Sequence, residues 1–316
     1  MHECRLLVLG DVMLDHFIVG RANRVSPEAP VPVVTFERDE YRAGGAANVA
    51  LNAQVLGASV DLIGLVGADG PSARLMEQLQ AGGVRGASLL TDEARRTTTT
   101  VRIVTTRHQQ VARVDYESDE PVTDAIERAI IEQLEAHAPH AGAIVVSDYA
   151  KGLVTRRVMA AVIAAGQQSG VAAFVDPASA HPDIYAGATV VTPSQADVES
   201  ATHIRIRTED NARRAAAAFR ELSRAEAVLI TRSELGMWLA CHDIEGRLPV
   251  ATREVSDVTG SGDTVVATLA LAVAAGATMA EAARLANEAA GISVGKSGPA
   301  TVTPAELLAA VLSRTP

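Results

Sequence analysis

The first hundred residues alternate between apolar runs and polar breaks in a pattern typical of an α/β sheet. Residues 5–10 form an apolar run that ends in glycine, which predicts a buried parallel strand. Residues 60–66 predict the next strand, and residues 71–80 predict the helix after it. The prolines between residues 15 and 42 exclude a helix there, and their β-branched neighbours indicate edge strands. Residues 42–48 then begin a helix rich in small residues that reaches residue 56.

The stretch from residue 97 to residue 117 has a different pattern. Residues 97–106 are dense in β-branched side chains, and apolar and charged residues alternate again beyond a polar tip at residues 107–110. We expect a hairpin that stands outside the main sheet and pairs with the proline-rich strands. Two segments, approximately residues 14–42 and 97–117, are therefore expected to form a small β-sheet lid.

After residue 121, strands and helices alternate regularly. The pattern predicts helices at residues 122–137, 155–168 and 208–223, and strands at residues 143–146, 171–175, 189–191 and 228–230. Such alternation predicts a mostly parallel, Rossmann-like sheet covered by helices on both faces. Because no repeat, linker or low-complexity segment divides the chain, we expect residues 1–316 to form a single α/β domain with the β lid inside it.

Polar residues recur directly after the last apolar residue of the predicted strands. These residues are Asp11, Asp148, Asp176, Ser194 and Thr231, and Asp15 follows shortly after the first of them. The carboxyl ends of parallel strands share one edge of a sheet, where open α/β sheets bind ligands. One such residue is explained by a turn, whereas five of them indicate a site.

Residues 257–264, with the sequence DVTGSGDT, are followed by an uninterrupted helix-forming run. Gly260 and Gly262 allow the backbone to approach a ligand closely at the start of the helix, where unpaired N–H groups bind anions. Asp263 brings negative charge to that anion site, which fits a carboxylate that takes a proton from a hydroxyl attacking a phosphate. The alternative is a helix start with an aspartate favoured by the helix dipole.

A second glycine-rich stretch and one lysine extend this hypothesis. Gly44 and Gly45 allow close approach of a ligand, and Asn48 offers a donor and an acceptor to a sugar hydroxyl; close packing of helix on sheet also explains these residues. Lys151 stands among small residues near Asp148, so it either binds a phosphate or is a solvated or Asp-paired lysine.

Composition narrows the class of protein. Of 316 residues, 48% are hydrophobic but only 3% are aromatic, so the core is built from Ala, Val, Leu and Ile. The net charge of −10 and the absence of long Lys/Arg runs argue against a nucleic-acid or membrane-surface partner. The two cysteines form no spacing motif, and no apolar stretch is long enough to cross a bilayer, so we expect a cytoplasmic protein.

Residues 44–48 followed by Leu56-Gly57, and residues 257–264 later in the chain, resemble the two signatures of the ribokinase/phosphofructokinase-B family of sugar kinases. Within that family, residues 10–15, 24–33, 147–152 and 231–236 resemble the branch that phosphorylates heptose 7-phosphate for lipopolysaccharide core synthesis. Many relatives carry a second, nucleotidyltransferase domain; since this chain ends at Pro316, the resemblance is to the stand-alone form.

The resemblance implies a ribokinase-like fold and an ATP-dependent reaction. ATP and D-glycero-β-D-manno-heptose 7-phosphate would give the 1,7-bisphosphate and ADP. Asp263 would be the base, and Gly260, Ser261 and Gly262 would form the anion hole. The sugar phosphate would be held by Asp11, Asp15, Gly44, Gly45, Asn48 and Asp148. Its distal phosphate requires cations, of which Lys151 is the first choice and Arg107 or Arg113 from the lid the second.

The resemblance also implies where nucleotide and metal bind. The nucleotide side would contain Thr231, Ser233, Gly236, Thr259, Gly260, Gly262, Asn287 and Gly291. The family's Asn-x-x-Glu motif falls on Ser194-Gln195-Ala196-Asp197, which departs at both ends; Asp197 can still order the water ligands of Mg²⁺. Asp257 and the loop at residues 295–298 are candidates for a monovalent cation such as K⁺.

Several alternatives stay open at this point. The chain could instead phosphorylate fructose or tagatose 6-phosphate, or it could be a non-catalytic sugar or nucleotide sensor, against which the retained Asp263 argues. A Rossmann dehydrogenase is disfavoured because no GxGxxG follows the first strand. Exposed β segments with apolar residues lead us to expect a homodimer through the β lid.

Overall fold

The computed structural model describes residues 4–107, 109–178, 181–242, 244–251, 255–296 and 298–313. Within these ranges the largest sheet has nine strands in the order β13-β12-β11-β10-β9-β8-β1-β4-β5. The strands from β11 to β5 are parallel, and only β12 and β13 run antiparallel to their neighbours. Their bounds are β1 Arg5–Gly10, β4 Ser59–Gly67, β5 Gly86–Asp92, β8 Ala143–Ser147, β9 Ala172–Asp176, β10 Val190–Val191, β11 Ala227–Thr231, β12 Met237–Ala240 and β13 Glu245–Leu248.

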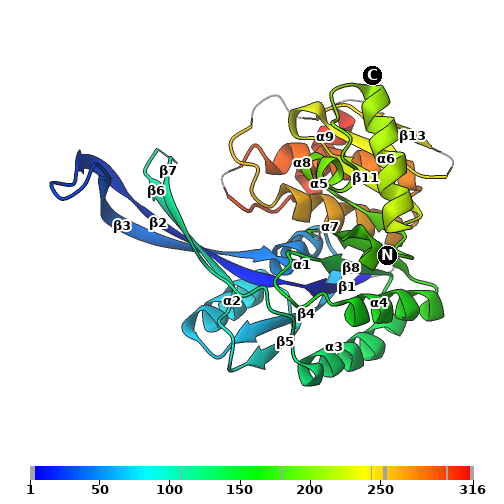
Figure 1. Ribbon diagram of the computed structural model, residues 1–316, viewed down its shortest axis with the longest axis horizontal. Helices are drawn as coiled ribbons and strands as arrows, with labels where there is room; N and C mark the ends of the chain where they lie inside the picture. The colour runs from blue at the N-terminus through cyan, green and yellow to red at the C-terminus, as the bar shows by residue number, and fades with distance from the viewer. Residues whose placement is uncertain are drawn as a thin grey trace.

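Helices cover both faces of this sheet, as the regular alternation of elements predicted (Figure 1). One face packs on α1 Ala46–Val55, α2 Gly70–Ala81, α7 Ser261–Ala274 and α8 Met279–Ser293, with α9 Pro304–Leu312 outside α8. The other face packs on α3 Asp124–His137, α4 Arg156–Ser169, α5 Gln195–Thr202 and α6 Glu209–Ser223. Three short 3₁₀ helices complete the described elements: η1 Ala138–His140, η2 Pro182–Tyr185 and η3 Ser233–Leu235.

The first strand shows why both faces are covered. Leu6 and Val8 belong to the apolar cluster on one face, whereas Leu7 and Leu9 belong to the cluster on the other. Because successive side chains of a strand point to opposite faces, a continuous apolar run requires a buried layer on each side.

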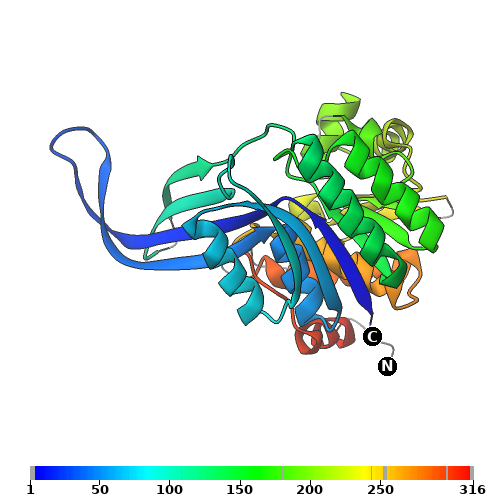
Figure 2. The same ribbon diagram turned by 90° about the horizontal axis from the view of Figure 1, so that it is seen from below.

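The lid is a separate four-stranded sheet in the order β3-β2-β6-β7. Its strands are β2 Val12–Val25, β3 Pro32–Gly45, β6 Thr99–Thr105 and β7 Gln110–Tyr116. Residues 14–20 of β2 pair in parallel with residues 99–105 of β6, which confirms the expected pairing of the hairpin with the proline-rich strands. Figures 1 and 2 show that the β2–β3 ribbon projects as a long arm from the main body.

One expected boundary is wrong. Residues 42–45 belong to strand β3 rather than to a helix, and α1 begins at Ala46. Gly45 pairs with Val12 in the lid sheet, and its φ of 57° turns the chain so that the Ala46 N–H donates to the Asp11 carbonyl at 3.0 Å. The glycine pair therefore ends a strand and directs the chain into the helix. Strands β5, β12 and β13 and helices α8 and α9 had no counterpart in the sequence predictions.

In the part of the chain that the structure describes, no helix has both the length and the apolar character required to span a membrane.

Candidate functional site

The polar residues that follow the strands do share one edge of the main sheet. The Asp148 N–H donates to the Asp176 carbonyl at 2.9 Å, and the Thr192 hydroxyl donates to an Asp176 carboxylate oxygen at 3.2 Å. Ser194 and Thr231 form a parallel bridge just beyond β10 and β11. Their common position confirms the edge inferred from the sequence and places it against the start of α7.

Asp263 lies in the first turn of α7 and is only 2% exposed. One carboxylate oxygen accepts a hydrogen bond from the Asn48 amide at 2.7 Å, and the other accepts one from the Tyr149 hydroxyl at 2.9 Å. Burial raises the pKa of Asp263 to about 7, against the opposing effect of these two hydrogen bonds. A carboxylate with such a pKa is matched to general-base chemistry near neutral pH.

Hydrogen bonds from Asn52 and Thr264 fix the orientation of the Asn48 side chain. Its side-chain oxygen accepts a hydrogen bond from the Asn52 amide at 3.2 Å, and the Asn52 oxygen accepts one from the Thr264 hydroxyl at 3.1 Å. The NH₂ group of Asn48 is therefore directed at Asp263. In this structure Asn48 orients the carboxylate, a contact that its expected role as a sugar ligand did not include.

The glycines before Asp263 make the start of α7 accessible. Gly260 has a φ of 74°, and a Cβ atom there would lie 2.6 Å from the Asn48 amide nitrogen, so no other residue fits without displacing Asn48. A Cβ at Gly262 would lie 3.4 Å from an Asp176 carboxylate oxygen. Ser261 is the first helical residue, but its N–H donates to the Val258 carbonyl at 3.2 Å, so the expectation that it contributes to the anion hole is wrong for this structure. The N–H groups of Gly260 and Gly262 stay the candidates for that role.

Two further carboxylates, Asp11 and Asp15, lie buried on the lid side of Asp263. Asp11 accepts hydrogen bonds from the N–H groups of Tyr149 at 2.8 Å and Lys151 at 3.1 Å, and burial raises its pKa to about 6. Burial also raises the pKa of Asp15, although its ion pair with Arg102 opposes the change.

Gly44 and Asp148 support this part of the site. A Cβ at Gly44 would lie 2.7 Å from an Asp15 carboxylate oxygen, so the glycine permits the lid strand to pass close to that side chain. Asp148 accepts hydrogen bonds from the Tyr185 hydroxyl at 2.6 Å and from the Ala150 N–H at 2.8 Å. Buried hydrogen-bond acceptors of this kind suit recognition of sugar hydroxyls.

Sequence reasoning missed two residues of this region. Arg102 on β6 pairs with Asp15 and lies 5.3 Å from the centre of the Phe17 ring, and Arg42 lies 5.5 Å from the centre of the same ring. The sequence does not reveal the strand register that sets Phe17 opposite Arg102. A lone arginine within a β-branched run could nevertheless have marked Arg102 as a candidate for the site. Tyr149 is the other missed residue; it stood next to Asp148 but was given no role.

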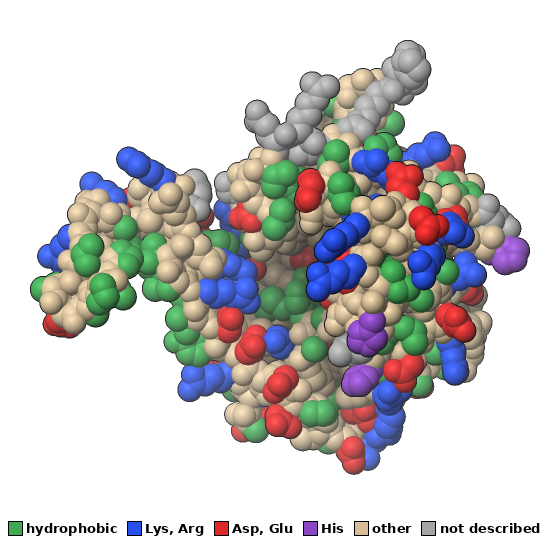
Figure 3. Space-filling model, turned by 45° about the horizontal axis from the view of Figure 1, so that its top comes forward, with side chains coloured by type: hydrophobic (Ala, Val, Ile, Leu, Met, Phe, Trp, Pro, Cys, Tyr) green, Lys and Arg blue, Asp and Glu red, His purple; other side chains and the backbone are tan. Residues whose placement is uncertain are grey.

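The three cations expected to bind the distal phosphate lie in different surroundings. Lys151 forms an ion pair with Glu117 at 2.8 Å, with its side chain 21% exposed. Arg113 pairs with Asp115 on the same strand at 2.8 Å, and Arg107 lies exposed in the turn after β6. Figure 3 shows a hollow between the arm and the main body, with Lys and Arg side chains on both sides of it.

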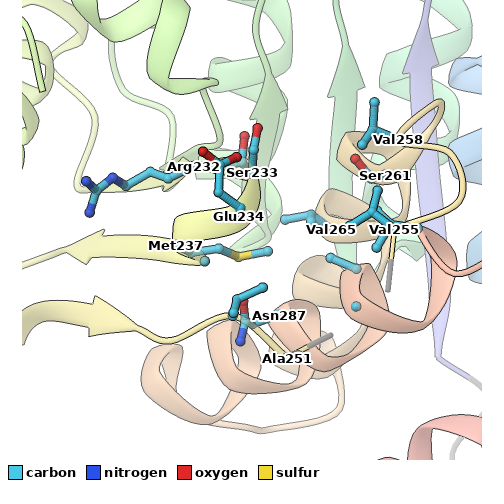
Figure 4. Close-up of a pocket in the computed structure, with 16 residues that line it drawn as sticks. Arg232, Ser233, Glu234, Met237, Ala251, Val255, Val258, Ser261, Val265 and Asn287 are labelled. Carbon is cyan, nitrogen blue, oxygen red and sulfur yellow. The ribbon is translucent and has the colours of Figure 1, made fainter. Parts of the chain in front are cut away.

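A cavity of about 350 Å³ opens beside the N-terminus of α7, within the size range of ligand pockets. The expected nucleotide residues Thr231, Ser233, Gly236, Asn287 and Gly291 all line it. So does a set of apolar residues that the sequence did not single out: Met237, Val250, Val255, Val258 and Val265. Figure 4 shows Met237, Val255, Val258 and Val265 around the cavity, whereas the Arg232 side chain points away from them. The Arg232 guanidinium donates to the Gln195 side-chain oxygen at 3.2 Å. Apolar walls with polar groups at the margin fit a purine base.

Thr259 does not line this cavity; it belongs to a turn held by Asp257. Asp257 accepts hydrogen bonds from the N–H and hydroxyl groups of Thr259 at 2.9 and 2.7 Å, and from the Gly298 N–H at 2.9 Å. These bonds hold its pKa below the ordinary value. Both oxygens are thus engaged in joining two loops, and the expected cation site there stays a prediction. Ser297 and His108 lie outside the described residues.

Asp197 and Ser194 form a capping box at the start of α5. The Ser194 hydroxyl donates to one Asp197 oxygen at 2.5 Å, and that oxygen also accepts the Ser194 N–H at 2.9 Å. Both Ser194 contacts are made to this one oxygen of the carboxylate. Among the described residues no group of three His, Cys, Asp or Glu side chains could bind a metal ion directly. A single carboxylate such as that of Asp197 is an oxygen donor of the kind that orders the water ligands of Mg²⁺, and this role stays a prediction.

Residues 5–306 match the family of pfkB carbohydrate kinases. The chain belongs to this family. Two curated relatives are named bifunctional protein HldE: that of Geotalea uraniireducens (strain Rf4), 42% identical over 312 residues, and that of Nitrobacter hamburgensis (strain DSM 10229 / NCIMB 13809 / X14), 45% identical over 312 residues. The matches cover 98% and 97% of this chain but only 63% of each relative, so the chain spans less than two thirds of their length.

Solved structures of pfkB-type and ribokinase-type enzymes share the fold. Phosphofructokinase-2 of Escherichia coli, solved in complex with potassium, superposes with a TM-score of 0.81 at 18% identity over 99% of this chain and all of that one. Arabidopsis thaliana ribokinase, complexed with ribose and ATP, gives 0.76 at 19% identity over 98% of this chain and 99% of that one. The family resemblance and the ribokinase-like fold are thus confirmed, and the protein is a carbohydrate kinase that transfers phosphate to an alcohol group.

Proposed function

We propose that this kinase uses ATP to phosphorylate the C1 hydroxyl of D-glycero-β-D-manno-heptose 7-phosphate, which gives the 1,7-bisphosphate for ADP-heptose and lipopolysaccharide core synthesis. The observation that carries the chemistry is Asp263, buried at the start of α7 and fixed by two hydrogen-bond donors. The four stretches that resemble heptose 7-phosphate kinases support the choice of sugar.

In the proposed reaction the C1 oxygen attacks the γ-phosphorus of ATP, and the bond from that phosphorus to the β–γ bridging oxygen breaks to release ADP. The proton of the hydroxyl passes to the Asp263 carboxylate. Because the transition state of phosphoryl transfer is loose, a weak base is sufficient. The N–H groups of Gly260 and Gly262 stabilise the charge on the transferred group, and Asp11 and Asp15 orient the sugar.

The nucleotide is assigned to the cavity between β11, β12, α7 and α8, with its base against the valines and its phosphates directed to Gly260 and Gly262. Asp197 is assigned to Mg²⁺ through a water molecule, and the ion supplies neutralisation of phosphate charge when it is bound. Ser194 holds Asp197 in the capping box and so has an indirect role. A requirement for K⁺ near Asp257 stays part of the proposal.

The distal phosphate of the sugar is assigned to Lys151, which lies next to Asp11 and exchanges its ion pair with Glu117 for the dianion. Arg102 and Arg42, on either side of Asp15, add positive charge on the lid side.

We expect Lys151→Met to raise KM for the sugar phosphate at least ~10-fold, in the range of a charged hydrogen bond, with a smaller change in kcat. An unphosphorylated heptose is the control, since its KM is expected to stay unchanged; an equal effect on both sugars contradicts the assignment.

We also infer a homodimer formed through the lid. The arm carries exposed apolar side chains, among them Val25, Val31 and Phe36, and β3 and β7 are the edge strands of the lid sheet in the described part of the chain.

The proposed function is tested by ADP release with heptose 7-phosphate, fructose 6-phosphate and unphosphorylated heptose at matched concentrations. We expect a kcat/KM for heptose 7-phosphate at least ~10²-fold above the others. The unphosphorylated heptose loses the charged contacts to the distal phosphate, whereas fructose 6-phosphate keeps a phosphate but presents its hydroxyl groups differently to the buried carboxylates. Equal or faster turnover of fructose 6-phosphate would leave the family and the fold unchanged but would overturn the substrate.

A further inference from the structure

Tyr149 contacts two carboxylates of the site, Asp11 on the proposed sugar side and Asp263, the proposed base. The N–H group of Tyr149 donates to Asp11 at 2.8 Å, and its hydroxyl donates to Asp263 at 2.9 Å. Asp11 follows β1 and Asp263 begins α7, so these two carboxylates come from opposite ends of the chain. Among the described residues, no other one donates to both of them.

We propose that Tyr149 is a positioning residue that fixes the Asp263 carboxylate relative to the sugar-binding Asp11. The inference rests on the proposed function only in taking Asp263 as the base of a sugar kinase; it does not depend on which sugar phosphate is the substrate.

The backbone around Tyr149 is built to hold it in this position. Ala150 has a φ of 55°, a conformation unfavourable for a residue with a side chain, and its N–H donates to Asp148 at 2.8 Å. The N–H of Lys151 joins that of Tyr149 on the same Asp11 oxygen. Three successive N–H groups are thus bound to carboxylates, and they set the direction in which the Tyr149 ring leaves the backbone.

The hydrogen bond from Tyr149 restricts rotation of the Asp263 carboxylate. Asn48 holds one carboxylate oxygen and Tyr149 holds the other, so rotation of the carboxylate breaks at least one hydrogen bond. Each oxygen has a second lone pair, which remains for the substrate hydroxyl. A base held in a single orientation reaches the near-attack geometry without losing further freedom.

Tyr149 acts as a donor and not as an acid. Burial and the nearby carboxylates of Asp263, Asp176 and Asp15 raise the pKa of its phenol well above the ordinary value, so it stays protonated at working pH. The charged groups around Asp263 are Asp15, which pairs with Arg102, and Asp176. In these surroundings the hydroxyl stabilises the ionised form of Asp263, and its removal favours the protonated form.

Tyr149→Phe tests the proposal, with Tyr185→Phe as the matched control. Tyr185 is also a buried tyrosine that donates to a carboxylate, but its partner is Asp148 rather than Asp263. We expect Tyr149→Phe to move the acid limb of the kcat–pH profile upward by about one pH unit, the size expected for a hydrogen bond to a charged group. At pH 6 kcat then falls about 10-fold, it recovers in part near pH 9, and KM for the sugar stays within ~3-fold. The acid limb of Tyr185→Phe is expected to stay in place.

Replacing Tyr149 by 3-fluorotyrosine keeps the ring and the hydroxyl but makes the hydroxyl a stronger donor, so the test does not depend on the folding of the phenylalanine variant. The acid limb is then expected to move to lower pH. If neither variant moves the acid limb, or if the loss in Tyr149→Phe is confined to KM, the inference is wrong. Failure of the proposed substrate is a separate result, because the profiles are measured with whichever sugar phosphate the wild-type enzyme turns over.

Discussion

Asp263 is at the same time deeply buried and held by two hydrogen-bond donors. Burial raises its pKa to about 7, and the donors Asn48 and Tyr149 keep it from rising further. Because a general base acts in its ionised form, kcat is expected to rise with pH through about 7 and then level off. A kcat–pH profile with saturating substrates measures this limb. A profile that is flat from pH 5 to 8 would contradict the assignment of Asp263 as the base.

The Asp176 carboxylate is expected to lower the stability of the folded protein at alkaline pH. Burial, and then the charge of Asp263, raise the pKa of Asp176 to about 8, above its ordinary value of 3.8. A group with a raised pKa in the folded state stabilises the protein below its unfolded pKa and loses that contribution as pH rises through the folded pKa. We therefore expect Asp176→Asn to raise Tm by at least ~2 °C at pH 8.5 and to change it little at pH 5. Thermal unfolding at the two pH values measures the difference; an equal shift at both would show that the carboxylate charge is not responsible.

Residue type and spacing alone singled out Asp263, Asp11 and the glycines as site candidates, because their combination is unusual. It did not show Arg102, whose contact with Asp15 depends on how β6 aligns with β2. Nor did it show Tyr149, since an aromatic residue beside Asp148 is equally well explained as core. The contacts that give these two residues their roles join positions 87 and 114 residues apart, and local pattern does not contain such contacts.

At the scale of elements, the start of α7 is where backbone and side chains depend on each other most. Gly260 permits the left-handed turn into the helix and leaves space for Asn48. We expect Gly260→Ala to displace Asn48 from Asp263 and to lower kcat at least ~10-fold, because a hydrogen bond to a charged group is lost. The left-handed backbone itself costs about 1 kcal/mol or more of stability.

Gly276, after the other end of α7, provides the matched control for this prediction. Its φ of 94° is also left-handed, but a Cβ there would meet nothing within 4 Å. Gly276→Ala is expected to lose comparable stability with kcat unchanged. Steady-state kinetics and thermal unfolding of both variants separate the two effects, and equal loss of kcat in both would refute the role of Gly260.

The elements also show where sequence patterns are sufficient. Strands buried on both faces, such as β1 and β8, and helices with a serine or threonine cap, such as α6 after Thr208, were found within one or two residues. The boundary at residues 42–45 was wrong because pairing with β2 outweighed the helix preference of Ala43, and the two glycines added no support for a helix. Tertiary contacts override local propensity at such positions.

In the molecule as a whole, the arm exposes apolar side chains that the main body does not cover. It projects from the body with Phe36 57% exposed, and hydrophobic side chains are visible along it in Figure 3. We expect Phe36→Arg to convert a dimer to a monomer, because a buried charge at an interface is unfavourable. Leu308→Arg is the control, since Leu308 is equally exposed at 59% but lies on α9. Sedimentation equilibrium measures the mass; a monomeric wild-type protein, or dissociation by both variants, would contradict a dimer through the lid.

In the proposed reaction, Asp263 promotes transfer of phosphate to the anomeric hydroxyl of heptose 7-phosphate. The most direct measurement is ³¹P NMR of the product formed by the wild-type enzyme and by Asp263→Asn with ATP and Mg²⁺. We expect the wild-type product to show a second phosphate coupled to the anomeric proton, and the variant to form it at least ~10²-fold more slowly, the contribution of a general base. A new phosphate at another position, or near-normal turnover by Asp263→Asn, would contradict this mechanism.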